Sequence, residues 1–447
     1  MKIVPVLTRA LWVMTPALSL FFISCAGSME FFREVDAQVT RGDYTGAVDA
    51  VRKNHDAYGD KSTVLYNLDM GLLLHYQGAA DSSNAYFFAA EQKMQDLYTK
   101  SISLAALSTI LNDNLLPYEG EDFEKVLVNM FLALNYAGKG EADDALVEAR
   151  KVDVKLREFS RQYEEKNTYK EDAFIRYVAG VLYESRGEIN DAFISYRKAY
   201  EIYQTYAVSY GTRAPSFLLD DIVRTATLMS FNDEADHYRS LGGRTFDRAD
   251  RSLGSIVVLT YVGKGPIKQE VRPTVSVPDD KGILHTFQIA LPKFVSRHTE
   301  SRSYDVTVRG TDTTYRATTE VAENVTAIAA KTLDDRLGLI YLKSGGRALL
   351  KFLAAEKAKS EIGKNGKNEG GNVLASIAID IAVGLTEQAD VRTWRTLPAE
   401  FQLSRVWVPP GEYAVRIESS DGGYTMRDVP VTVLSGNNRF VIADDIR

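Results

Sequence analysis

The sequence predicts an α+β protein of more than one domain, with an all-α first half followed by a β-rich second half. Between Met29 and about Leu241, apolar residues recur at three- and four-residue spacing, which is the period of helices. From Ser255 onward, β-branched residues and alternation of period two take over, as expected for strands. The length of 447 residues suits two or three domains.

The composition excludes several classes of protein. Hydrophobic residues make up 45% of the chain, enough for ordinary folded cores. Lys and Arg number 53 against 60 Asp and Glu, without a long basic block, so we expect no nucleic-acid partner. One cysteine, Cys25, and five scattered histidines cannot form a disulfide framework or a cysteine-based zinc site within one chain.

The N-terminus has the order of a secretory signal. Lys2 and Arg9 precede the apolar run Ala10–Ile23, and small residues follow around Cys25. The unique cysteine at the cleavage position resembles a bacterial lipoprotein signal. An ordinary secretory signal or a short membrane helix, with Cys25 incidental, is the alternative.

The lipoprotein resemblance implies that residues 1–24 are removed and that Cys25 is acylated. More than one acyl chain gives stable membrane anchoring. Ala26 follows the cysteine where an aspartate would signal retention at the inner membrane, so outer-membrane residence on the periplasmic face is favoured.

A helical pattern with fixed small and aromatic positions repeats in the first half. Its clearest copy, AGVLYESRGEINDAFISYRKAYEIY, has Gly180, Tyr183, Gly187, Ala192, Tyr196 and Ala199 at the spacings of the tetratricopeptide repeat, which it resembles. Three further copies are anchored by Gly42, Gly78 and Gly140. We therefore expect a tetratricopeptide-like domain over residues 25–245.

Repeat arrays of this kind present a concave groove that binds other proteins. The resemblance assigns groove positions in two repeats, which we expect to bind a protein or peptide partner; these are Leu65, Leu68, Leu72, His75, Tyr76, Phe174, Tyr177, Val181 and Glu184. Coverage of several of these positions by another part of the chain is the alternative.

Five tyrosines lie on one face of a predicted helix: Tyr196, Tyr200, Tyr203, Tyr206 and Tyr210. A recognition strip is one interpretation, because tyrosine offers a large contact area at low entropic cost. Packing of a long helix on the array or on the second domain is favoured.

We expect the second domain to span residues 254–447, with a helical insertion around 321–388. The predicted strands are Ser255–Tyr261, Leu284–Ala290, Tyr304–Arg309, Thr314–Thr319, Phe401–Val408, Tyr413–Glu418, Met426–Leu434 and Arg439–Ala443. In VWVPPGEYAVRIE, Pro409, Pro410 and Gly411 predict a turn, and the flanking alternation predicts a hairpin of the kind found in β-sandwiches.

The insertion is expected to contain three helices, Val321–Ser344, Ala348–Ile362 and Asn372–Glu387. The last is strongly apolar but short and carries Asp380, so a buried helix is favoured over a membrane span. Conditional contact with lipid or with a partner helix is the alternative.

Catalytic and cofactor motifs are missing from the sequence, which favours a protein without enzymatic activity, metal or small-molecule cofactor. Paired aspartates such as Asp220 with Asp221 and Asp444 with Asp445 are expected to cap helices or face solvent. Arg and Trp residues around Trp394 suit either a binding hot spot or a covered sheet edge.

The signal, the repeats and the stretches TEQAD, RTWRTLP and PPGEY together resemble an uncharacterised family of Gram-negative repeat-containing lipoproteins. Relatives in that family are encoded beside lipoprotein activators of penicillin-binding proteins, which implies a role in the cell envelope or cell wall. We expect a lipid-anchored, periplasm-facing scaffold that binds a protein partner. The alternative is a glycan- or peptidoglycan-binding or adhesive lipoprotein, which Trp394 and Trp407 exposed in one cleft would favour.

Overall fold

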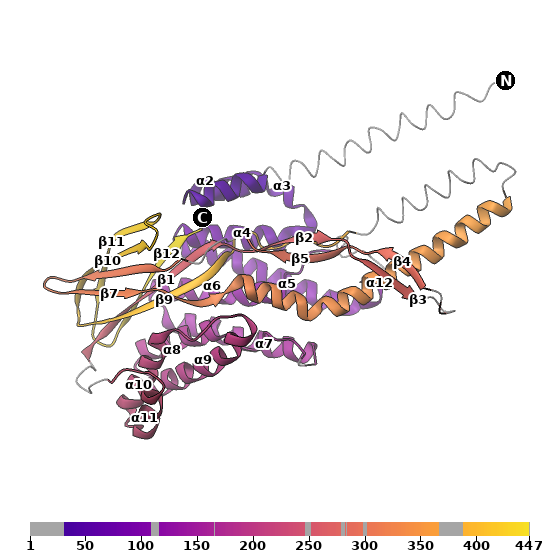
Figure 1. Cartoon of the computed structure of the whole chain (residues 1–447). Coiled ribbons are helices and arrows are strands. Elements are labelled where there is room, and N and C mark those ends of the chain that lie inside the picture. The colour runs from indigo at the N-terminus through magenta and orange to yellow at the C-terminus, as the bar shows by residue number, and fades with distance from the viewer. Residues whose placement is uncertain are drawn as a thin grey trace.

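The computed structural model describes residues 31–108, 116–164, 166–245, 252–278, 282, 284–297, 302–365 and 388–446. The predicted signal, Cys25 and the predicted helix Asn372–Glu387 lie outside these residues. The fold is of the α+β class: helices occupy the first half, and strands predominate in the second half around one long helix (Figure 1).

The first half is a series of antiparallel helical hairpins. A helix over residues 31–40 is followed by α2 and the short α3, and longer hairpins come after them. The helices are α2 (Tyr44–Lys53), α3 (His55–Tyr58), α4 (Thr63–Tyr76), α5 (Ala80–Ser108), α6 (Asp122–Lys139), α7 (Ala142–Gln162), α8 (Ala173–Ser185), α9 (Ile189–Ser209), α10 (Ser216–Met229) and α11 (Asn232–Ser240). The hairpins α4/α5, α6/α7 and α8/α9 coincide with predicted repeat copies.

The four anchoring glycines end the first helix of their hairpins. Gly42, Gly78, Gly140 and Gly187 have φ between 71° and 80°, a left-handed conformation that glycine adopts without a Cβ clash. The sequence pattern misses the last hairpin, α10/α11, because Ser230 stands at the equivalent turn with φ 63°.

Small residues also allow the two helices of a hairpin to approach each other closely. A Cβ added at Gly180 would overlap the ring of Tyr196, and one at Gly71 would lie 2.7 Å from the ring of Phe87. Both rings are fully buried. The lack of a side chain at Gly71 and Gly180 therefore makes room for the aromatic ring from the second helix of each hairpin.

The second half forms two four-stranded sheets and a narrow two-stranded ribbon. The central sheet has the order β12-β1-β9-β8, and the outer sheet has the order β11-β10-β6-β7. The strands of the two sheets are β1 (Gly254–Lys264), β6 (Tyr304–Arg309), β7 (Thr314–Thr318), β8 (Glu320–Asn324), β9 (Pro398–Val408), β10 (Gly411–Ser419), β11 (Thr425–Val433) and β12 (Asn438–Asp445).

The central sheet is covered on both faces. On β1, Val257, Leu259 and Tyr261 join the core of the helical array, whereas Ile256 and Val258 join the core shared with the outer sheet. This double burial explains why GSIVVLTYV is apolar without interruption. One hydrophobic core thus runs across the expected boundary between residues 245 and 254.

The predicted hairpin at Pro409 and Pro410 is wrong. β9 and β10 flank these prolines but belong to different sheets, because both edges of β9 are already paired, with β1 and β8. The turn carries the chain from the central sheet to the outer sheet. Alternation on both sides of a turn does not reveal which neighbour each strand will choose.

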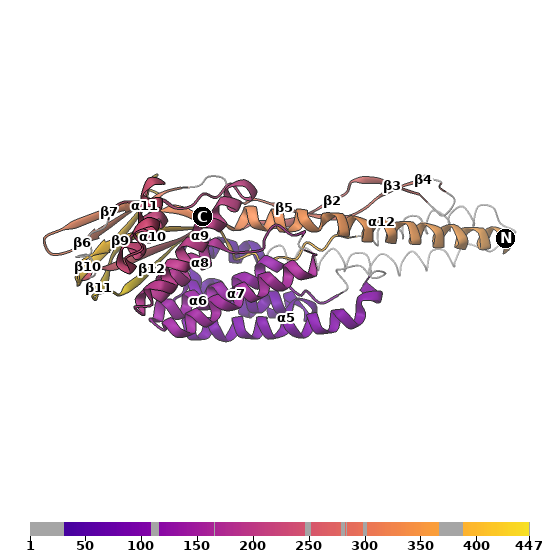
Figure 2. The same cartoon turned by 90° about the horizontal axis from the view of Figure 1, so that it is seen from below.

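The helical insertion also differs from expectation. Val321 belongs to strand β8, and the first two predicted helices, Val321–Ser344 and Ala348–Ile362, are one continuous helix, α12 (Val325–Asn365). The ribbon consists of two two-stranded sheets, formed by β2 (Ile267–Val271) with β5 (Leu291–Val295) and by β3 (Thr274–Pro278) with β4 (Leu284–Gln288). Of these strands, only β4 was predicted. Ribbon and α12 project together from the body, which gives the molecule an elongated shape (Figures 1 and 2).

Within the described ranges, none of the helices combines the length and apolar character needed to cross a membrane.

Candidate functional site

The predicted groove residues lie beneath the chain's own central sheet. Eight of them are buried and Tyr76 is half-buried. Figure 1 shows the strands of this sheet lying along the array. In this structure, other parts of the same chain pack against these residues.

In the earlier of the two repeats, His75 connects the array to β1. Its Nε2 lies 2.7 Å from the hydroxyl of Tyr261, and its Nδ1 lies 2.6 Å from Oδ1 of Asn135. Burial lowers the pKa of His75 to about 4, so the imidazole is neutral at pH 7. Tyr76 donates a hydrogen bond to the carbonyl of Thr396 at 3.2 Å.

In the later repeat, aromatic and charged groups meet β9. Phe174 stacks on Phe401 with ring centroids 5.2 Å apart. Arg405 donates to Glu184 at 2.8 Å and forms an ion pair of 2.9 Å with Asp221. Tyr177 also donates to Asp221, at 2.9 Å.

The nine residues therefore do not form an open partner-binding surface in this structure. The physical reason is that the central sheet supplies apolar area together with the donors and acceptors that the groove requires; for example, Asn438 on β12 donates to the carbonyl of Val181 at 3.0 Å. In this structure, the central sheet of the same chain packs against this face of the array.

The five tyrosines predicted to share one helix face, Tyr196, Tyr200, Tyr203, Tyr206 and Tyr210, form a packing surface, here called the tyrosine stripe. Four of its five members are buried, and Tyr200 is half-buried. Tyr203 donates to the carbonyl of Ala322 on β8 at 2.9 Å, and Tyr206 donates to the carbonyl of Glu171 at 3.2 Å. The stripe thus joins α9 to the second half of the chain and to the segment before α8.

The two tryptophans do not share an exposed cleft. Trp394 is fully buried between Phe87 and Phe131, with its backbone N–H bonded to Glu124 at 2.8 Å. Trp407 lies against the guanidinium groups of Arg224 and Arg405, about 4 Å from its ring centre. Of the two interpretations of the residues around Trp394, a binding hot spot or a covered sheet edge, the structure agrees with the covered edge.

The two aspartate pairs Asp220/Asp221 and Asp444/Asp445 differ from expectation. Asp221 lies within α10 and is completely buried, and Arg405 and Tyr177 both contact its Oδ2. Asp445 is buried and accepts from Tyr304 at 2.8 Å, while Asp444 accepts from Tyr44. Burial and the neighbouring Asp445 raise the pKa of Asp444 to about 7.

A buried carboxyl pair joins the array to β8. Asp172 caps α8 by accepting from the backbone of Ile175 at 2.8 Å, and Glu323 bonds to Asp172 from the sheet side. Burial, then the charge of Asp172, raises the pKa of Glu323 well above its ordinary value. The described residues hold no metal-binding cluster of His, Cys, Asp and Glu.

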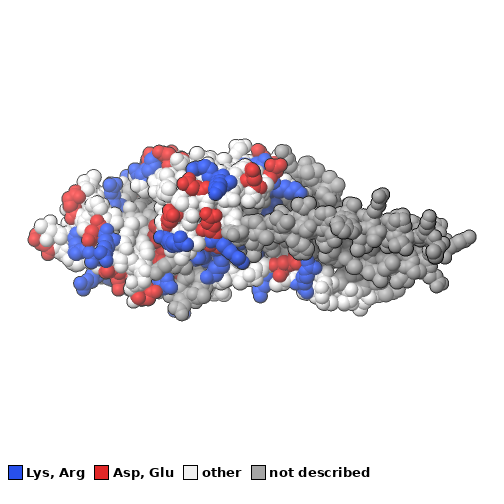
Figure 3. All heavy atoms as spheres, turned by 90° about the horizontal axis from the view of Figure 1, so that it is seen from above, with Lys and Arg blue, Asp and Glu red and all other residues white. Residues whose placement is uncertain are grey.

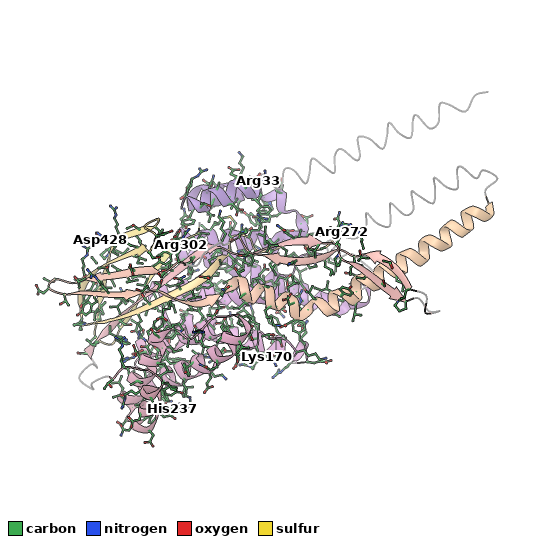
Figure 4. All side chains as sticks on the ribbon, in the orientation of Figure 1. Arg33, Lys170, His237, Arg272, Arg302 and Asp428 are labelled. Carbon is green, nitrogen blue, oxygen red and sulfur yellow. The ribbon has the colours of Figure 1, made fainter. Side chains whose placement is uncertain are left out.

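A cavity of about 310 Å³ remains open between the end of α7, the segment that follows it and α12. Its walls combine apolar or aromatic residues with polar ones; the lining includes Asp122, Phe159, Tyr163, Tyr169, Thr332, Asp335, Arg336 and Leu339. Lys170, which Figure 4 labels, follows directly on this lining segment. The volume is at the lower end of the range for small-ligand pockets.

Ion pairs and hydrogen bonds hold the polar wall in place. Nη1 of Arg336 lies 3.0 Å from Glu121 and 3.7 Å from Asp122. Asp122 also accepts from the hydroxyl of Tyr163 at 2.6 Å. Asp335 accepts from the backbone N–H of Thr168 at 2.6 Å.

This cavity was not predicted from the sequence. Its residues come from α6, α7, the following segment and α12, so only the fold brings them together. One local clue was present at the start of α6, where Glu121 and Glu124 form a capping box. The charge of the segment after α7 was compatible with a solvated loop.

The fold therefore defines a helical-hairpin array whose groove holds the chain's own β-sheet. No known family profile or curated protein sequence matches this chain.

Part of the chain resembles several solved structures. The apo form of RapI is 15% identical over 47% of this chain and 51% of RapI, with a TM-score of 0.36. This match therefore spans about half the length of RapI. MamA AMB-1 is 18% identical over 48% of this chain and 89% of its own, with a TM-score of 0.29. BtubC from P. vanneervenii is 15% identical over 54% and 89%, with a TM-score of 0.33. Similarity at this level does not assign a function.

Proposed function

We propose that this chain is a non-catalytic, lipid-anchored scaffold on the periplasmic face of the outer membrane, which binds a protein partner in cell-envelope or cell-wall assembly. The proposed anchor is an acylated Cys25. The array and the central sheet form one body, and the partner binds outside the closed groove, on α12 and the adjoining cavity.

One observation carries the choice of surface: α12 exposes large apolar side chains along a projecting element. Leu339, Tyr341 and Leu342 are 54%, 42% and 74% exposed. The cavity opens beside the first of them. Clustered apolar side chains on a projecting helix favour a protein contact over solvent.

Basic and acidic side chains are interspersed on the coloured part of the face shown in Figure 3.

The glycan-binding alternative has no comparable support. Trp394 is in the core, and Trp407 lies against two arginines. Neither ring offers the open aromatic face on which a sugar could stack.

A crosslinked pull-down from cell envelopes tests the proposed surface. The test variant carries Tyr341→Ser and Leu342→Glu, and the matched control carries Val208→Ser, an 88% exposed residue on α9. We expect wild type and control to recover the same protein and the α12 variant to lose it. Recovery of the same protein by all three would exclude α12 as the binding surface.

A separate experiment tests the anchor. Cells fed an alkyne fatty acid should label the wild-type chain, and Cys25→Ser should abolish both the label and membrane fractionation. Labelling that persists in Cys25→Ser would contradict acylation at this residue.

A further inference from the structure

We propose that the cavity between α7 and α12 binds an uncharged group with an apolar body and an adjacent carbonyl, such as a large apolar side chain and the backbone carbonyl beside it in a partner segment. This inference rests on the proposed scaffold function. It adds the chemistry of the partner that the cavity selects.

The apolar body is inferred from the lining. The rings of Phe159, Tyr163 and Tyr169 and the side chain of Leu339 contribute to the walls. Of these, Leu339 is more than half exposed although it is large and apolar. A bound apolar group would remove this surface from water, at roughly 25 cal/mol per Å² of apolar area.

The carbonyl is inferred from Arg336. In the part of the chain that the structure describes, its ion pairs with Glu121 and Asp122 both use Nη1. Arg336 is one of the lining residues, its side chain is 25% exposed, and no hydrogen bond from its remaining N–H groups to another described residue is found. Since guanidinium has donors only, the complementary ligand atom is an acceptor such as a carbonyl oxygen.

A second polar group lacks a partner at the same wall. Thr332 is one helical turn before Arg336 on α12, and its Oγ1 is buried without a hydrogen bond among the described residues. A buried hydroxyl that makes no hydrogen bond has a free-energy cost, because it has lost its contacts with water. A small rotation of the threonine side chain towards a ligand would recover part of that cost.

We infer that the ligand carries no net charge from the balance of acidic and basic side chains at the cavity wall. Each acid near the cavity has a basic partner among the described residues; the pairs are Glu121 with Lys268, Asp122 with Lys125, Asp335 with Lys331, and Glu164 with Lys166. The positive charge of Arg336 is further compensated by the neighbouring Glu119. A charged ligand would lose hydration without meeting an unbalanced opposite charge.

Three matched probes test this chemistry: 3-phenylpropanamide, 3-phenylpropanoate and 3-phenylpropylammonium. They share one apolar body and differ in charge and in the acceptor. Binding to the full chain is measured by ligand-observed NMR titration. We expect the amide to bind saturably in the millimolar range, the carboxylate at least threefold more weakly, and the ammonium not at all.

Two variants place the probe in the cavity. Leu339→Glu introduces a charge at the wall and should weaken amide binding at least tenfold, whereas Val208→Glu, on α9 outside the lining, should leave it unchanged. Both residues are more than half exposed, so neither change is expected to unfold the protein. Circular dichroism checks this directly.

The outcomes separate this inference from the proposed function. No amide binding, tighter binding of either charged probe, or equal effects of the two variants would overturn the cavity proposal. The envelope pull-down with Tyr341→Ser and Leu342→Glu would stand independently, because neither residue lines the cavity.

Discussion

Arg405 on β9 and Asp221 on α10 form an ion pair of 2.9 Å in which neither side chain is exposed to solvent. The pair joins the array to the central sheet. Glu184 on α8 is bonded to the same guanidinium at 2.8 Å. One buried cation therefore fixes two helices of the array to one strand of the sheet.

Replacing Arg405 by an uncharged residue should destabilise the protein. Arg405→Met leaves Glu184 and Asp221 without their shared partner and should lower the free energy of unfolding by about 3–5 kcal/mol, measured by urea denaturation. The control Arg416→Met removes an exposed pair with Asp428 and should cost about 0–1 kcal/mol. Similar losses in both variants would show that the buried cluster does not join the two halves energetically.

The close approach of α8 and α9 gives a second prediction. Gly180→Ala would press a methyl group into the ring of Tyr196 and should destabilise the protein by about 1–3 kcal/mol in the same assay. Gly138→Ala, in α6 with open space around its Cβ position, should instead stabilise it by about 0.5–1 kcal/mol. If Gly180→Ala also stabilised the protein, the two helices could not be as close as described.

The turns between paired helices give a reciprocal prediction. Ser230 has φ 63° and Gly187 has φ 76°, at equivalent places in successive hairpins. Because a Cβ atom disfavours this conformation by about 1–2 kcal/mol, Ser230→Gly should raise the melting temperature and Gly187→Ser should lower it. Two shifts of the same sign would contradict the equivalence of the turns.

The contact between Tyr44 and Asp444 predicts a pH dependence. The pKa of Asp444 is raised to about 7 in the folded protein, so the folded state holds a proton that the unfolded state releases near pH 4. The contribution of this group to stability is complete below pH 4 and is lost as the pH rises towards 7.

Asp444→Asn removes this titration and keeps a carbonyl acceptor for Tyr44. The difference in unfolding free energy between variant and wild type should grow in favour of the variant from pH 4 to pH 7, followed by urea denaturation at each pH. Titrating groups that do not interact with Asp444 cancel in that difference. A constant difference across the range would mean that Asp444 has an ordinary pKa.

Much of the local structure could be predicted from the sequence, because it depends on near neighbours. Gly42, Gly78, Gly140 and Gly187 marked the turns of four hairpins, and the strand Tyr304–Arg309 was predicted with its observed bounds. These features depend on periodicity and on backbone conformations that few residues adopt.

The site could not be predicted, because it depends on which distant segments meet. Nothing near Pro409 indicates that β9 pairs with β1 and β8 and leaves β10 to another sheet. Likewise, Tyr177 and Glu184 were placed on the groove face without any local sign that Arg405 and Asp221 would meet them there.

The central claim is that the sheet is a permanent part of the array, and native-state hydrogen exchange tests it most directly. In the full chain under increasing denaturant, the amides of α8 and β9 should exchange with one common opening free energy, equal to that of global unfolding. Opening of β9 and β1 at a clearly lower free energy than α8 would contradict the claim, because the groove would then be available to another occupant while the array stayed folded.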